Sequence, residues 1–185
     1  PLCGRNFEYF SEDPCLSGKI AASYIRGVEK KNVGACVKHF AANNQETDRS
    51  FVSADVDERT LREIYLKSFE IAIKESKPSA VMTAYNRING LKCSESPFLL
   101  KKILRDEWGF DGLIMSDWIE VKKGLTSLKS GLNLAMPFDK KVRNDVLEGI
   151  KQGKIKEPEL DVAIGKLIEF SDRAKPEKGE YNRNI

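Results

Sequence analysis

The sequence lacks the residues that build metal centres and the segments that cross membranes. It contains one histidine, and its four cysteines, Cys3, Cys15, Cys36 and Cys93, show no C-x-x-C spacing. Zinc sites need clustered cysteine and histidine ligands, so we predict reduced thiols and no bound metal. No run of about 18 apolar residues is present, which argues against a membrane span. The first residues also lack a signal-peptide pattern, although the chain does not begin with methionine.

The sequence also lacks an excess of one charge and any phosphate-binding loop. The 31 basic and 28 acidic residues nearly balance, giving a net charge of +3, so no nucleic-acid partner is expected. There is no G-x-G-x-x-G or P-loop string, which argues against a phosphate-binding parallel-sheet enzyme. No asparagine lies in an N-x-Ser/Thr pattern. Together with unpaired cysteines, this favours a cytoplasmic protein.

Apolar runs alternate with amphipathic segments along the chain. The runs are short and rich in Val, Ile and Leu, as in buried strands, and the segments between them repeat apolar residues every three or four positions, as in helices. An Asn89-Gly90 pair predicts a turn. The predicted strands are 33–40, 80–85, 113–116 and 132–135, and the predicted helices are 14–31, 57–77, 96–108, a short one ending near 129, 140–152 and 158–170.

This order of elements predicts an α/β fold with a parallel sheet. Polar residues gather where successive strands end, and in a (β/α)8 barrel those ends converge on one active-site mouth. An open doubly wound sheet fits the alternation too, but the clustered strand ends favour the barrel. Four strands cannot close it, so we predict an incomplete TIM-type barrel without its N-terminal strands over 1–170, followed by a linker over 171–185.

Acidic residues precede basic ones by four positions on the helix predicted from Asp57. The pairs are Glu58 with Arg62, Glu63 with Lys67, and Glu70 with Lys74. This order stabilises a solvated helix face. We therefore predict three ion pairs along one continuous helix.

Asp117 directly follows an apolar strand, where a carboxylate would be rigidly mounted. An ionised carboxylate in that position can attack an anomeric carbon. A strand-end aspartate can equally cap the next helix. The short string Ser116-Asp117-Trp118 does not decide between these roles.

Other polar and aromatic residues at strand ends are candidates for binding a sugar. Lys38 and His39 can donate hydrogen bonds to hydroxyls, although a lone buried histidine is more often a core residue. Tyr85 and Trp118 can stack on a pyranose ring or pack in the core. Arg5 can fork onto two sugar oxygens or pair with Glu8 or Glu12.

Four strings in the correct order resemble family-3 glycoside hydrolases. They are Pro1 to Pro14 (PLCGRNFEYFSEDP), Lys38 to Glu46 (KHFAANNQE), Asp57 to Glu63 (DERTLRE) and Leu113 to Trp118 (LIMSDW), and the resemblance extends to about Phe170. It implies that Asp117 is the nucleophile of a retaining β-glucosidase-type enzyme. It implies further that Arg5, Lys38, His39, Tyr85 and Trp118 bind the sugar, without a metal or an organic cofactor.

The loop Ala41 to Glu46 differs from the Pro-Gly-His-Gly-like loop of related β-N-acetylglucosaminidases, which favours β-glucosides or oligosaccharides as substrates over N-acetylglucosaminides. A β-xylosidase of the same family is the nearest alternative. A catalytically idle sugar-binding relative is another alternative, because Asn133 and Ala135 stand where relatives commonly have carboxylates. Ile119 likewise replaces a frequent glycine.

The resemblance also implies partners outside the chain. Relatives place one sugar-binding aspartate before Pro1 and the acid/base glutamate in a following α/β-sandwich domain. Glu46, Glu58 and Glu120 are carboxylates within the chain, but no motif supports any of them as the acid. We therefore expect the chain by itself to be inactive.

Overall fold

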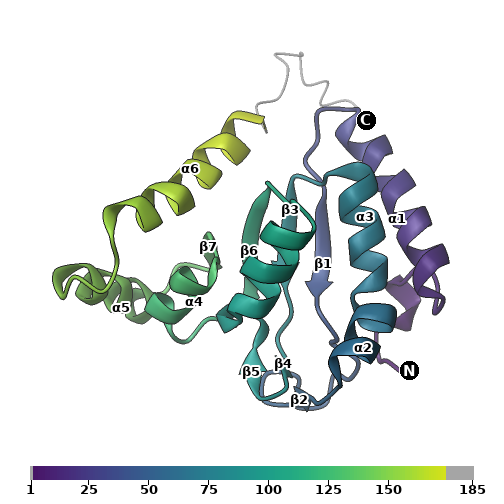
Figure 1. Ribbon diagram of the computed structural model, residues 1–185, viewed down its shortest axis with the longest axis horizontal. Coiled ribbons are helices and arrows are strands. Elements are labelled where there is room, and N and C mark those ends of the chain that lie inside the picture. The colour runs from purple at the N-terminus through teal and green to yellow at the C-terminus, as the bar shows by residue number, and fades with distance from the viewer. Residues whose placement is uncertain (1, 174–185) are drawn as a thin grey trace, which may run out of the picture.

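A parallel four-stranded sheet forms the centre of the computed structural model, which describes residues 2–173 (Figure 1). Its strands are β1 (Cys36–Phe40), β3 (Ala80–Thr83), β6 (Leu113–Trp118) and β7 (Leu134–Met136), and they lie side by side in the order β1-β3-β6-β7. Every pair in this sheet is parallel. The predicted α/β fold with a parallel sheet is therefore confirmed, with β1 and β7 as its outer strands.

Helices connect successive strands of this sheet. The helix α1 precedes β1 and lies against α3, both on the β1 side of the sheet in Figure 1. Close contact is possible there because Gly18 of α1 has no side chain, and a Cβ at that position would lie 2.7 Å from Cβ of Ile71. The helices are α1 (Pro14–Glu29), α2 (Glu58–Thr60), α3 (Lys67–Ser76), α4 (Gly124–Ser130), α5 (Lys140–Lys151) and α6 (Glu157–Arg173), with short 3-10 turns η1 (Asn6–Glu8) and η3 (Cys93–Glu95).

Two segments predicted as ordinary α-helix are π-helical. They are η2 (Leu61–Tyr65) and η4 (Phe98–Glu107). In η2 the Leu66 N–H donates to the Leu61 carbonyl, so the turn holds one residue more than an α-helical turn. The extra residue separates Glu63 from Lys67, and the predicted pair between them was wrong. Glu63 instead pairs with Arg59 at 3.0 Å.

The other two predicted helix pairs are present. Glu58 contacts Arg62 at 2.8 Å, and Glu70 contacts Lys74 at 2.7 Å. Lys67, displaced from Glu63, also contacts Glu70, at 3.0 Å. Two of the three predicted acid-before-base pairs are therefore confirmed.

A second, three-stranded sheet lies beyond the carboxyl ends of the main strands (Figure 1). It consists of β2 (Ser53–Ala54), β4 (Arg87–Ile88) and β5 (Leu91–Lys92), and it was not predicted. The predicted Asn89-Gly90 turn joins β4 to β5, and both residues have positive φ, 49° and 82°. The small sheet holds the loops after β1 and β3 together.

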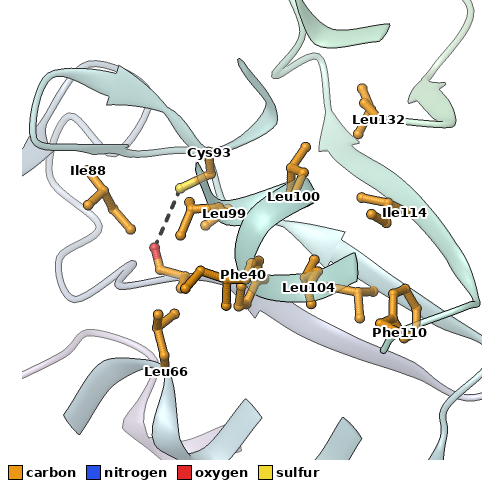
Figure 2. Packing of buried hydrophobic residues seen from close by; sticks show 14 of the residues in the cluster. Phe40, Leu66, Ile88, Cys93, Leu99, Leu100, Leu104, Phe110, Ile114 and Leu132 are labelled. Atoms are coloured by element: carbon orange, nitrogen blue, oxygen red, sulfur yellow. Dashed lines mark hydrogen bonds between the residues drawn. The ribbon is translucent and has the colours of Figure 1, made fainter. Parts of the chain in front are cut away.

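The main core lies between the sheet and the helices that cover it (Figure 2). The Phe40 ring packs edge-on against Phe69 and Trp108, with ring centroids 5.2 and 5.8 Å away. Next to it, the Cys93 thiol donates to the Ala41 carbonyl at 3.6 Å. The carboxyl end of β1 is thereby fixed on both sides of its last residue.

Polar side chains close the opposite, amino ends of the strands. The Glu29 carboxylate accepts the backbone N–H groups of Ala35 and Ser79 at 2.9 and 2.8 Å. Asn133 Oδ1 accepts the Ile114 N–H at 2.9 Å and an Arg105 N–H at 3.0 Å. The Asn133 difference from relatives therefore lies at the end of the sheet away from Asp117.

Several predicted boundaries were wrong by a few residues. β1 begins at Cys36 rather than residue 33, and β6 continues through Asp117 to Trp118 because its end still bonds to β7. Helix α6 runs to Arg173, so the first residues of the predicted 171–185 linker are helical. Residues 174–185 of that linker lie outside the described residues. Within residues 2–173, no helix is long and apolar enough to cross a membrane.

Candidate active site

Asp117 lies inside β6 and is 8% exposed. Its Oδ1 accepts the backbone N–H of Trp118 at 2.7 Å. The next helix, α4, begins only at Gly124 and follows Lys123 without a side-chain cap. Asp117 is therefore not a helix cap, and its second oxygen, Oδ2, is directed to other partners.

His39 is the first of those partners. Its Nε2 lies 3.3 Å from Asp117 Oδ2, so the end of β1 contacts the end of β6 across β3. Burial, together with the nearby Arg5 and Lys38 cations, lowers the pKa of His39 to about 4, although Asp117 opposes the shift. At neutral pH the imidazole is uncharged. It can hold the carboxylate by a hydrogen bond without forming an ion pair with it.

Tyr85 follows β3 and is the second partner. Its half-buried phenol hydrogen-bonds to Asp117, and burial followed by the negative charge of Asp117 raises the pKa of that phenol. The guanidinium of Arg49 stacks over the ring, 4.2 Å from its centroid. Arg49 in turn contacts Glu46 Oε2 at 2.7 Å. A chain of contacts, an ion pair followed by a cation–π contact and a hydrogen bond, thus runs from the loop after β1 to the carboxylate.

Arg5 forms an ion pair that the sequence allowed and also contacts a residue of the site. Its Nε forms an ion pair with Glu8, and its Nη1 lies 3.4 Å from His39 Nε2. Glu8 is one of the two partners predicted for a structural arginine. The second contact brings the guanidinium to the edge of the Asp117 site.

Lys38 and Trp118 lie beside the buried residues and are exposed. Lys38 precedes His39 on β1. Trp118 follows Asp117 and is 60% exposed, so its indole is not a core residue. The structure therefore joins Asp117, His39, Tyr85 and Arg5 directly and leaves Lys38 and Trp118 free to meet a ligand.

Arg49 is a site residue that the sequence did not predict. It lies in the polar loop between β1 and β2, where no periodic pattern marks single residues. Its spacing of three from Glu46 was the available signal, since the two side chains form an ion pair.

The three carboxylates considered as possible acids all have cationic partners. Glu46 pairs with Arg49, Glu58 with Arg62, and Glu120 with Lys92. Glu120 is only 1% exposed and Glu58 lies in α2. Each of them is thus engaged by a cation of this chain. Within residues 2–173, no group of three or more His, Cys, Asp or Glu side chains is arranged to hold a metal ion.

A hollow of about 450 Å³ lies between α1, α3 and β1, where Tyr9, Tyr24 and Phe69 contribute to its lining. His39 and Lys38 reach its wall, but Asp117 does not line it. The hollow is therefore separate from the carboxylate site.

Comparison with known sequences places nearly the whole chain in one family. The model of the glycosyl hydrolase family 3 N-terminal domain matches residues 1–170. Thermostable beta-glucosidase B of Acetivibrio thermocellus is 48% identical over 100% of this chain and 25% of its own length. An exo-alpha-(1->6)-L-arabinopyranosidase of Bifidobacterium longum is 45% identical over 95% of this chain and 23% of its own.

Solved structures agree. Beta-glucosidase 3B of Thermotoga neapolitana, in complex with glucose, superposes with a TM-score of 0.86 at 48% identity, covering 96% of this chain and 27% of that one. A GH3 beta-glucosidase of Bifidobacterium adolescentis gives a TM-score of 0.94 at 41% identity, covering 100% and 28%. The chain thus spans about a quarter of the length of these relatives.

Proposed function

This chain belongs to glycoside hydrolase family 3, and on that premise we propose that it supplies the nucleophile half of an active site that hydrolyses terminal β-linked glucosides with retention. The observation that carries the proposal is the buried Asp117 carboxylate in contact with a neutral His39. Asp117 attacks the anomeric carbon and the aglycone leaves. Water then breaks the covalent glycosyl-enzyme.

The surroundings of Asp117 favour attack over mere charge pairing. The Trp118 N–H, the His39 imidazole and the Tyr85 phenol hold the carboxylate in one orientation. None of these three groups is cationic at neutral pH, so the carboxylate keeps its negative charge available for the sugar. A set of hydrogen bonds of this kind places a nucleophile accurately.

The sugar is held by residues around that carboxylate. Arg5 and Lys38 donate hydrogen bonds to its hydroxyls, whereas His39 and Tyr85, whose single N–H and O–H are directed to Asp117, accept hydrogen bonds from them. The exposed Trp118 indole stacks against the ring or its aglycone. The binding requires no metal or cofactor.

The general acid comes from outside the chain. Retaining hydrolysis needs two carboxyl groups about 5 to 5.5 Å apart, and the carboxylates Glu46, Glu58 and Glu120 are engaged by cations. We assign the acid to an α/β-sandwich domain following the segment 171–185 in the same polypeptide. The four strands are then part of a (β/α)8 barrel, completed by strands preceding residue 1. With four free thiols, we place the protein in the cytoplasm.

The test measures aryl β-glucoside hydrolysis by the chain alone and by the chain with its natural flanking sequence. We expect activity only in the extended protein, with glucose released first as the β-anomer. Asp117→Ala should lower kcat by at least about 10³-fold. Glu58→Gln, a surface carboxylate exchange, serves as the matched control and keeps full activity. An active Asp117→Ala protein, or release of the α-anomer, would refute the mechanism.

Substrate range is settled in the same assay. Aryl β-D-xyloside and aryl α-L-arabinopyranoside are compared with the glucoside, since the Bifidobacterium longum relative is an arabinopyranosidase. A preference for either pentoside would mean that this pentoside, and not the β-glucoside, is the substrate. An extended protein that binds glucose without turning over any glycoside would establish the sugar-binding alternative.

A further inference from the structure

Three loops around the candidate active site meet at one buried ammonium group. Lys92 lies in β5 with its side chain 8% exposed. Its Nζ is 3.5 Å from each of three backbone carbonyl oxygens, those of Ser50, Tyr85 and Glu120. An ammonium group has three N–H donors. These oxygens belong to the loops after β1, β3 and β6, so one side chain links all three.

Each of those carbonyls is close in sequence to a residue of the site. Ser50 follows Arg49, and Tyr85 carries one of the carbonyls itself. Glu120 comes three residues after Asp117. The side chains of Arg49 and Tyr85 stack together, and Tyr85 hydrogen-bonds to Asp117. A shift in any one of the three loops therefore changes the position of a group around the nucleophile.

Glu120 balances the buried charge. Its side chain is fully buried, with Oε1 3.6 Å from Lys92 Nζ and accepting the Ser94 hydroxyl at 2.8 Å. Oε2 is also buried and has no hydrogen-bond partner among residues 2–173. A buried ion pair of this kind is seldom more stable than well-packed apolar side chains. Its place next to the site, where Lys92 joins three loops, therefore points to a role other than stability.

We propose that Lys92, with Glu120 as its charge partner, is a positioning residue that sets the relative placement of Arg49, Tyr85 and Asp117. The inference rests on the proposed function. Lys92 acts only through the three carbonyls and does not touch the sugar. Its removal slows the attack by Asp117 even when the protein remains folded.

The test isolates the attack step in the chain with its natural flanking sequence. The probe is 2,4-dinitrophenyl 2-deoxy-2-fluoro-β-D-glucoside. A carboxylate oxygen of Asp117 bonds to the anomeric carbon while the bond to dinitrophenolate breaks, and this leaving group needs no protonation. The rate of dinitrophenolate release, with its dependence on probe concentration, gives kinact and KI for molecules that are folded.

Four variants separate positioning from stability. Lys92→Met leaves Glu120 buried without its partner and lowers Tm, whereas Lys92→Met with Glu120→Gln removes both charges and recovers most of that loss. Glu120→Gln alone retains the ammonium and its carbonyl contacts. Glu29→Gln disturbs the amino ends of β1 and β3 instead, and it is the control for lost stability.

We expect the double variant to label about 100-fold more slowly than wild type through kinact, while Glu120→Gln and Glu29→Gln label within about threefold. Labelling of the double variant at the wild-type rate would overturn the positioning role. Equal slowing in Glu29→Gln would overturn it too, because the effect would then follow stability. A wild-type protein that is not labelled at all refutes the proposed function, and this inference with it.

Discussion

Replacing Asn133 with aspartate is expected to stabilise the fold without altering the active site. Asn133 Oδ1 accepts two N–H groups, from Ile114 at 2.9 Å and from Arg105 at 3.0 Å. Burial lowers the pKa of Arg105, and the negative charges of Asp111 and Glu169 oppose this shift only in part. A carboxylate at position 133 would face that half-buried guanidinium and add an attraction of about 4 kcal/mol at an effective dielectric of about 20.

Desolvation of the new carboxylate offsets most of this attraction, which leaves a net gain of about 1 kcal/mol. In a domain of this size, that gain corresponds to a rise in Tm of about 2 to 4 °C at pH 7. The folded-state pKa of the new aspartate lies below its unfolded value. The gain is therefore complete above about pH 4 and disappears as the pH falls through the folded-state pKa.

The assay is thermal unfolding of wild type and Asn133→Asp at pH 7 and pH 3, compared at each pH. Asn133→Ala is the control, and it should cost about 2 to 4 kcal/mol because both donors lose their acceptor. The reasoning is refuted if Asn133→Asp lowers Tm at pH 7. It is also refuted if the gain is as large at pH 3 as at pH 7.

Four further predictions test separate features. Ile119 has a strained φ of 64°, so Ile119→Gly should raise the free energy of unfolding by about 1 kcal/mol, measured with urea. A decrease would mean that the side-chain contacts of Ile119 stabilise the fold by more than its backbone strain costs. On α1, Gly27 has open space around it, so Gly27→Ala should stabilise the fold by about 0.5 to 1 kcal/mol. Gly18 packs closely against Ile71, so Gly18→Ala should destabilise the fold by about 1 to 3 kcal/mol in the same assay. Equal effects of the two substitutions would contradict the close packing at Gly18. The folded-state pKa of His39 is about 4, against 6.5 for an ordinary histidine, so the unfolded chain binds a proton first as the pH falls. The unfolding free energy of wild type should therefore drop by up to about 3 kcal/mol between pH 6.5 and 4, and His39→Gln should lack this drop. Parallel curves of stability against pH for the two proteins would contradict the prediction. Under the proposed function, Arg49→Lys should lower kcat/KM about tenfold, because an ammonium cannot stack on a phenol ring as a planar guanidinium does, and an unchanged value would exclude Arg49 from the site.

The main sheet was predictable because its strands carry the strongest local signal. Each is a short apolar run between helices, and the run before Asp117 is long enough to mark the residue at its end. Strand boundaries were less certain, since β6 extends through Trp118 only because β7 offers it backbone partners. That pairing is a tertiary effect, which a local pattern does not contain.

The remaining features depend on contacts between distant residues. The strands β2, β4 and β5 are two residues long, too short for any periodicity. The π-helical turn at Leu61–Tyr65 breaks a spacing rule that the sequence alone satisfies. The contacts of Arg49 with Tyr85 and of Lys92 with Glu120 join segments separated by many residues, so composition and spacing give no sign of them.

Ile119 shows how a sequence difference can acquire a physical meaning from the structure. Relatives often have glycine at this position, and the positive φ of 64° explains that preference, since a β-branched residue is strained there. The backbone conformation is kept because the Ile119 N–H bonds to the Met136 carbonyl at 2.9 Å. The difference therefore carries a cost in stability while leaving the path of the chain unchanged.

The position of β1 at the border of the sheet has a consequence for handling the chain by itself. Within residues 2–173, β1 pairs with β3 alone, and Cys36 on β1 is exposed. An unpaired strand edge offers its backbone N–H and C=O groups to any other chain. Preparations of the isolated chain are thus expected to self-associate with rising concentration. Solubility, rather than folding, would then limit what can be measured on it.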